Sequence, residues 1–190
     1  MSTENLARAF AMTRGILTNV TPDQFDLPTP CASWDVRALI NHVVEGANWF
    51  GLCVEAGAAP EEDPTAGVDY AGGDLLGSFD AGAARSLAAF AAPGALDKAI
   101  DLPFGTMPGG AFLGIATDDV FAHGWDLAKA TGQPTDLDPE LAASLLAQME
   151  AFLPPEIRGA DGVAPFGPAT DAPEGASAAD RLAAFLGRTV

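Results

Sequence analysis

The chain has 190 residues, with 26 Asp or Glu against nine Lys or Arg, so its formal net charge is −17. Such an acidic surface repels phosphate backbones, and we expect no nucleic-acid binding. The length suffices for one domain with a hydrophobic core. No apolar run reaches the roughly 18 residues that a membrane span needs. The N-terminus has no basic segment followed by an apolar stretch, so we expect a cytoplasmic protein rather than a secreted or membrane one.

The first half of the chain predicts three helices joined by loops. Apolar residues recur there at helical spacing, and prolines and glycines interrupt the pattern. Ser33 is the expected N-cap of the second helix, with Asp35 in its first turn. The three predicted helices cover residues 3–19, 34–56 and 69–92.

The second half predicts an interrupted segment and three further helices. Residues 95–110 contain too many glycines and prolines for a helix and indicate an extended segment or a hairpin. Helices are expected at 111–131, 138–152 and 177–187, with a proline-rich connection at 154–176. Four long helices with short connections favour an all-α fold, a four-helix bundle. We expect this bundle to cover residues 1–134. Residues 135–190 would form a short helical appendage and a wrapped connection packing on it.

Both histidines of the chain lie within predicted helices. Asp119 precedes His123 by four residues, so the two side chains share one helix face and can converge on a cation. His42 could reach the same point from a facing helix. Two imidazoles, one carboxylate and an open position are typical of a catalytic zinc site and also suit nickel or ferrous iron. The spacing alone leaves a second interpretation open, in which each histidine is a hydrogen-bonded core residue without a metal.

Three segments carry a resemblance to a known family. DLPTPCASWDVRALINHVVEGANWF resembles the signature P-T-P-C-x-x-W-x-V-x-x-L-x-x-H of an actinobacterial-type family. That family is similar to DinB/YfiT-like proteins and to mycothiol-dependent maleylpyruvate isomerases. DDVFAHGWDLAKATGQP resembles its second signature, an acid four residues before a histidine and then W-D-L-A-x-A-T-G. FGPATDAPEGASAADRLAAFLGRTV resembles its closing segment.

The resemblance implies a DinB-like four-helix bundle with a divalent metal, zinc or nickel, bound between helices. Its ligands would be His42, Asp119 and His123, with aspartate where several relatives carry glutamate. It also implies a metal-dependent enzyme that activates a low-molecular-weight thiol for transfer or isomerisation. Its partners would be a small-molecule substrate or thiol, and a homodimer is compatible with the family. The alternative is a non-enzymatic metal-binding or stress-associated bundle that acts as a homo-oligomer.

Further residues are candidates around this site. Asp126 follows His123 by three residues and could accept a hydrogen bond from its imidazole, although a surface acid has the same pattern. Trp34 and Trp125 could border a ligand pocket, although bundle packing is the simpler interpretation.

The cysteines and isolated arginines have simpler interpretations. Cys31 precedes a helix, where a thiol can be reactive, but packing is the simpler role. Cys31 and Cys53 are both expected to be free thiols, because two cysteines make no disulfide framework. Arg14 and Arg37 could meet a substrate carboxylate, but surface ion pairs are the default expectation.

Overall fold

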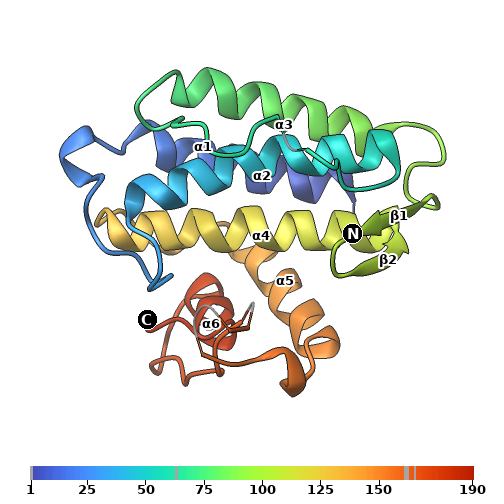
Figure 1. Cartoon of the computed structure of the whole chain (residues 1–190). Helices are drawn as coiled ribbons and strands as arrows, with labels where there is room; N and C mark the ends of the chain where they lie inside the picture. The colour runs from blue at the N-terminus through green and yellow to red at the C-terminus, as the bar shows by residue number, and fades with distance from the viewer. Residues whose placement is uncertain (1, 63, 161–162, 165) are drawn as a thin grey trace.

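The computed structural model describes residues 2–62, 64–160, 163–164 and 166–190, and over these the chain is mostly helical (Figure 1). Six α-helices and one two-stranded sheet occur in the described part. The helices are α1 (Thr3–Thr18), α2 (Val36–Ala56), α3 (Leu75–Ala91), α4 (Gly109–Ala130), α5 (Pro139–Phe152) and α6 (Ala178–Phe185). Two short 3₁₀ helices, η1 (Pro22–Gln24) and η2 (Pro155–Ile157), lie in the connections.

The prediction of an all-α four-helix bundle was therefore only partly right. The chain is mostly helical, but it has six helices over the described residues, and β1 (Ala99–Leu102) and β2 (Gly105–Pro108) form an antiparallel hairpin. Ile100 and Leu102 alternate inward from β1, as a half-buried strand requires. Gly105 follows the two-residue turn at φ +124°, a conformation that L side chains rarely adopt.

The four longest helices surround one hydrophobic core. Helix α2 packs on α3 and α1 packs on α4, while contacts of α1 with α3 and of α2 with α4 complete the arrangement (Figure 1). An apolar stripe at helical spacing directs one face of α2 inward. Buried members of that stripe include Leu39, Ile40, Val43, Val44 and Ala47.

Capping side chains set where the helices begin. Asp35, and not Ser33 as predicted, caps α2, because its carboxylate accepts a hydrogen bond from the Ala38 amide at 2.8 Å. Helix α3 begins six residues later than predicted, since Gly72 and Gly73 disfavour helix and Asp74 supplies the cap. Asp138 caps α5 ahead of a first-turn proline, and Ser177 caps α6.

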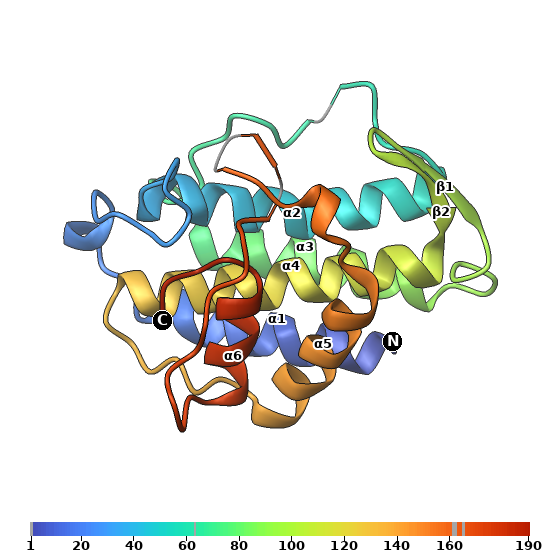
Figure 2. The same cartoon turned by 90° about the horizontal axis from the view of Figure 1, so that it is seen from below.

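The C-terminal part of the chain lies against α4. Helices α5 and α6 pack on each other, and α6 also contacts α4 (Figure 2). The Trp125 indole N–H of α4 donates to Asp180 Oδ1 of α6 at 2.9 Å. The division into residues 1–134 and 135–190 stays a prediction. In the described part of the chain, no helix has the length and apolar character needed to cross a membrane.

Candidate metal centre

Helices α2 and α4 bring the three predicted ligand residues together. Asp119 Oδ1 lies 3.5 Å from His123 Nε2 and 3.8 Å from His42 Nε2. The two imidazole rings are 4.8 Å apart, nearly perpendicular at 88°. One donor atom from each of the three residues lies within 4.8 Å of the other two. The predicted i, i+4 convergence of Asp119 and His123 is therefore present, with His42 facing it.

These distances fit a cation better than they fit hydrogen bonds. His42 Nε2 is buried and has no hydrogen-bond partner among the described residues. Buried polar atoms are normally satisfied, so an orphaned imidazole nitrogen beside a carboxylate calls for a ligand. Donor atoms around a tetrahedral zinc ion, with bonds of roughly 2.0–2.1 Å, lie about 3.3 Å apart. The two Asp119 distances, 3.5 and 3.8 Å, are close to this value, so the donor set fits a metal ion.

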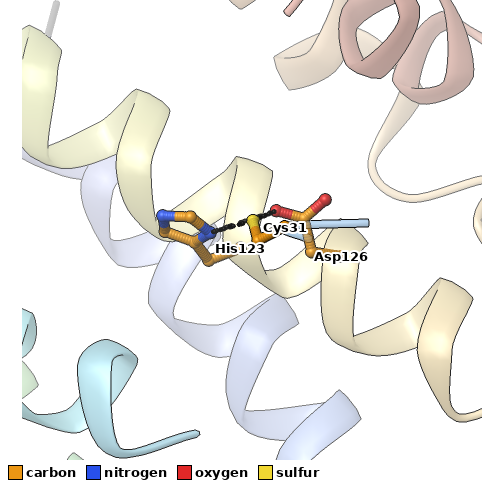
Figure 3. A group of neighbouring side chains, drawn as sticks. All are labelled: Cys31, His123 and Asp126. Carbon is orange, nitrogen blue, oxygen red and sulfur yellow. Dashed lines mark hydrogen bonds and ion pairs between the residues drawn. The ribbon is translucent and has the colours of Figure 1, made fainter. Parts of the chain in front are cut away.

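A group of side chains behind His123 fixes its orientation. His123 Nδ1 lies 3.0 Å from Asp126 Oδ2, and this carboxylate is fully buried (Figure 3). Arg188, from the C-terminal tail, donates to Asp126 through Nε at 3.1 Å and Nη2 at 2.9 Å. Because Asp126 is an acceptor, it places the imidazole proton on Nδ1 and leaves the Nε2 lone pair directed toward Asp119.

The charges of this group support that proton placement. Burial alone would raise the pKa of Asp126, but the hydrogen bond from His123 and the Arg188 charge outweigh it and lower the pKa to about 2. Burial likewise opposes ionisation of Asp119, yet the two facing imidazoles hold its pKa below the ordinary value. Burial would lower the pKa of His42, but Asp119 and Glu45 raise it overall. The site therefore favours a cation, either a proton or a metal ion, between these groups.

A second cluster shares His123 but suits a cation less well. Cys31 Sγ donates to Asp126 Oδ2 at 3.2 Å and lies 3.9 Å from His123 Nδ1 (Figure 3). Arg188 Nη2 also donates to Cys31 Sγ at 3.7 Å. The Arg188 guanidinium already compensates the charge of Asp126, so this cluster does not require a metal ion. Its groups instead hold the His123 imidazole in its orientation.

An open cavity of about 250 Å³ adjoins the candidate centre. Two of the three candidate ligands, His42 and Asp119, form part of its wall. The rest of the lining comes from α2, α4 and the hairpin turn: Glu45, Gly46, Trp49, Phe50, Phe104 and Ile115.

Of the two tryptophans predicted as pocket candidates, Trp34 borders the two candidate histidine ligands and Trp125 faces α6. Trp34 packs against the imidazole of His42, with ring centroids 4.5 Å apart, and also contacts His123. Trp125 is 1 % exposed and directed at α6. Neither belongs to the cavity lining, whereas Trp49, which the sequence analysis did not select, does.

The remaining candidates have structural contacts. Neither Cys31 nor Cys53 forms a disulfide bond, as predicted, and Cys53 is fully buried. Arg14 pairs with Asp80 at 2.6 Å and Arg37 pairs with Asp69 at 2.7 Å, the surface ion pairs that were the default expectation.

Sequence reasoning missed Arg188 and most of the cavity wall. Arg188 lies 62 residues from Asp126, and only its place in the closing signature segment could have drawn attention to it. Trp49 had a local signal, because it follows His42 by seven residues, two helical turns along the same face. Phe104 had none, since its position depends on the hairpin.

The fold and this site define a mostly helical protein with a candidate two-histidine, one-carboxylate metal centre at the α2–α4 interface. The family described as "Mycothiol maleylpyruvate isomerase N-terminal domain" matches residues 6–128, and the chain belongs to this family. This agrees with the family that the signature segments indicated.

Known relatives and structures agree with this membership. Two curated proteins of Mycobacterium tuberculosis, from strains CDC 1551 / Oshkosh and ATCC 25618 / H37Rv, are each named as uncharacterized. Each is 43% identical over 190 residues, covering 100% of this chain and 97% of the relative. Crystal structures of the mycothiol-dependent maleylpyruvate isomerase and of a histidine-to-alanine mutant are similar in fold. Their TM-scores are 0.57 and 0.58 at 20% identity, covering 77% of this chain and 68% of theirs.

Proposed function

We propose that the chain binds one divalent metal ion, zinc or nickel, through His42, Asp119 and His123, and is an enzyme that activates a low-molecular-weight thiol for transfer or isomerisation. The observation that carries this proposal is the orphaned His42 Nε2, which faces Asp119 beside an open cavity. A metal ion at this point would satisfy the buried nitrogen and leave room for a further ligand.

Each side chain has a defined task in this proposal. A divalent metal ion in an open site supplies one chemical effect, which is to lower the pKa of a bound thiol so that its nucleophilic thiolate form persists. His42 and His123 present Nε2, and Asp119 contributes the anionic oxygen. Asp126 keeps the proton of His123 on Nδ1, away from the metal position. The adjoining cavity would admit the small-molecule substrate.

The family name and the fold support a thiol as partner. The solved structures of similar fold are of the mycothiol-dependent maleylpyruvate isomerase, and mycothiol is accordingly our candidate thiol. We place the activity in the cytoplasm, where thiols stay reduced. The alternative of a non-enzymatic metal-binding homo-oligomer would favour a closed shell with a fourth protein donor. Among the described residues the group at His42 has three donors and borders a cavity, which favours the enzyme.

Metal content tests the core of the proposal. Elemental analysis should find about one zinc or nickel ion in the wild-type protein and little in the His42→Ala, Asp119→Asn and His123→Ala variants. Asp118→Asn is the matched control, because Asp118 neighbours Asp119 on α4 but contacts Gln148 of α5.

The control substitution should leave the fold intact. Burial, with the charge of Asp119, raises the pKa of Asp118 to about 8, so an amide mimics its neutral form. Asp118→Asn should therefore retain wild-type metal content. Equally low metal in all five proteins, or full metal in the three ligand variants, would overturn the proposal.

Thiol binding is tested separately on cobalt-substituted protein. Titration with a small thiol should produce the near-ultraviolet absorption of a cobalt–thiolate bond. A spectrum that stays unchanged at the highest thiol concentration would refute the proposed thiol chemistry. It would not contradict the metal site.

A further inference from the structure

Gly46 is a glycine that the packing of α2 does not require. It lies in the middle of the helix and its φ is not positive, so an L side chain fits its backbone. A Cβ built there would lie 3.7 Å from Phe50 Cε2 and 3.8 Å from Asp119 Oδ2, which are ordinary van der Waals distances. Glycine is, after proline, the least favourable residue inside a helix, so alanine at this position would stabilise α2. The glycine therefore calls for another explanation.

The second glycine within α2, Gly51, shows the contrast. A Cβ at Gly51 would lie 2.7 Å from Arg85 Cγ and 3.1 Å from the Ser86 amide nitrogen. These distances leave no room for a side chain, so Gly51 permits the close approach of α2 and α3. Gly46 instead lines the cavity beside the candidate metal centre. What distinguishes Gly46 is therefore the open space in front of it.

This space lies next to two of the candidate ligands. Gly46 follows His42 by four residues, one turn along the same helix face. Helical side chains lean toward the N-terminus, so a side chain at position 46 would extend over the turn of His42 as well as toward Asp119. Asp119 Oδ1 is the oxygen near both imidazoles, whereas Oδ2 is the oxygen near Gly46. A larger side chain at this position would fill cavity space beside the metal position.

Helix α4 supplies the opposite side of this space. Helices α2 and α4 run antiparallel (Figure 1), so one turn after His42 and one turn before Asp119 lie in the same direction, toward the hairpin. The residue one turn before Asp119 is Ile115, which also lines the cavity. A ligand that enters from the cavity therefore reaches His42 and Asp119 between Gly46 and Ile115, a space that we call the passage.

We propose that Gly46 sets the size of the molecule that reaches the open position of the metal centre. With glycine at this point, a ligand that carries a ring behind its donor atom can lie in the passage. A branched side chain at position 46 excludes that ligand and still admits a compact one. The selection is steric and does not depend on the charge of the ligand. The inference rests on the proposed function, because it names the residue that sets which molecules the same centre accepts.

The test uses cobalt-loaded full-length protein and two neutral ligands with the same donor. Imidazole is compact, whereas 4-phenylimidazole extends it by a ring that has to lie in the passage. The visible absorption of cobalt(II) changes when a ligand binds and gives both dissociation constants. The wild-type protein should bind both ligands. Gly46→Val should weaken 4-phenylimidazole roughly tenfold relative to imidazole, because overlap with the added methyl groups costs at least that much.

Matched variants separate steric selection from a damaged fold. Gly15→Val, at a helical glycine with open space around it and outside the cavity lining, should leave the ratio of the two constants unchanged. Gly46→Ala should raise the urea midpoint of the metal-free protein, whereas loss of a glycine needed for packing would lower it. The cobalt affinity of the Gly46 variants should equal that of the wild type. Ile115→Ala in the Gly46→Val background should restore binding of 4-phenylimidazole.

Each result has a distinct consequence. A lowered midpoint in Gly46→Ala, an unchanged ligand ratio in Gly46→Val or a wild-type protein that rejects 4-phenylimidazole would overturn the role of Gly46. No recovery with Ile115→Ala would contradict a passage between α2 and α4. A wild-type protein that takes up no cobalt would overturn the proposed function and this inference together. A protein that selects by size but forms no cobalt–thiolate bond would overturn the thiol chemistry alone.

Discussion

Replacing Arg188 by methionine breaks the contact between the C-terminal tail and the candidate metal centre. Arg188 is 11 % exposed and donates two hydrogen bonds to the fully buried Asp126. Removing one partner of a buried ion pair costs about 3–5 kcal/mol, because the remaining charge is left uncompensated. His123 and Cys31 still contact Asp126 Oδ2 in the variant, so we expect the lower end, about 3 kcal/mol.

Urea denaturation of metal-free protein, followed by far-ultraviolet circular dichroism, measures this loss. Arg181→Met is the matched control, since Arg181 makes an exposed hydrogen bond to the Ala176 carbonyl. The control should change the free energy of unfolding by less than about 0.5 kcal/mol. A double-mutant cycle with Asp126→Asn should give a coupling of at least about 1 kcal/mol. If Arg188→Met costs no more than the control, the buried pair does not stabilise the tail as argued.

Two further predictions concern stability. A Cβ at Gly82 would lie 3.0 Å from the Asn48 backbone nitrogen, so Gly82→Ala should lower the free energy of unfolding by about 1 kcal/mol despite its better helix propensity. Gly15 has open space around it, so Gly15→Ala should raise the free energy of unfolding by about 0.5–1 kcal/mol in urea denaturation. A Gly82→Ala variant more stable than the Gly15→Ala variant would contradict the close α2–α3 packing. Burial would raise the pKa of Asp180, but hydrogen bonds, led by that from Trp125, lower it overall. A carboxylate whose pKa is lower in the folded state stabilises the fold at pH values above its unfolded-state pKa. This stabilisation is lost as the pH falls through the folded-state pKa. Asp180→Asn should accordingly flatten the acid limb of the stability–pH curve, and an unchanged limb would contradict the pKa direction.

Local spacing predicted much of the helical part of the fold and the convergence of the candidate ligands. Asp119 and His123 share a face because they lie one helical turn apart, which is a property of α4 alone. The approach of His42 needed only the further condition that α2 faces α4. The same spacing could have identified Trp49, since it lies two turns from His42.

Contacts that depend on the path of the chain between helices had no such signal. Arg188 meets Asp126 only because α5, α6 and the tail return to α4, and the sequence does not specify that return locally. Phe104 is placed in the cavity wall by the hairpin. The hairpin is attached to the end of α2 by backbone hydrogen bonds and by the Lys98 ammonium, contacts between segments that lie far apart in the sequence. Asp35 caps α2 in place of Ser33 because the helix begins at Val36, and Asp35 itself is in extended backbone that pairs with Pro28.

The two histidines of the candidate centre are oriented by segments outside the helices that carry them. The ring of Trp34, from the loop before α2, packs on His42, while Arg188 acts on His123 through Asp126. Changes in the loop or the tail would therefore alter the orientation and basicity of a ligand without replacing it. The adjoining cavity depends on a third segment, because the hairpin contributes Phe104. Relatives with the same three ligand residues could thus differ in metal affinity through the loop and the tail, and in substrate through the hairpin.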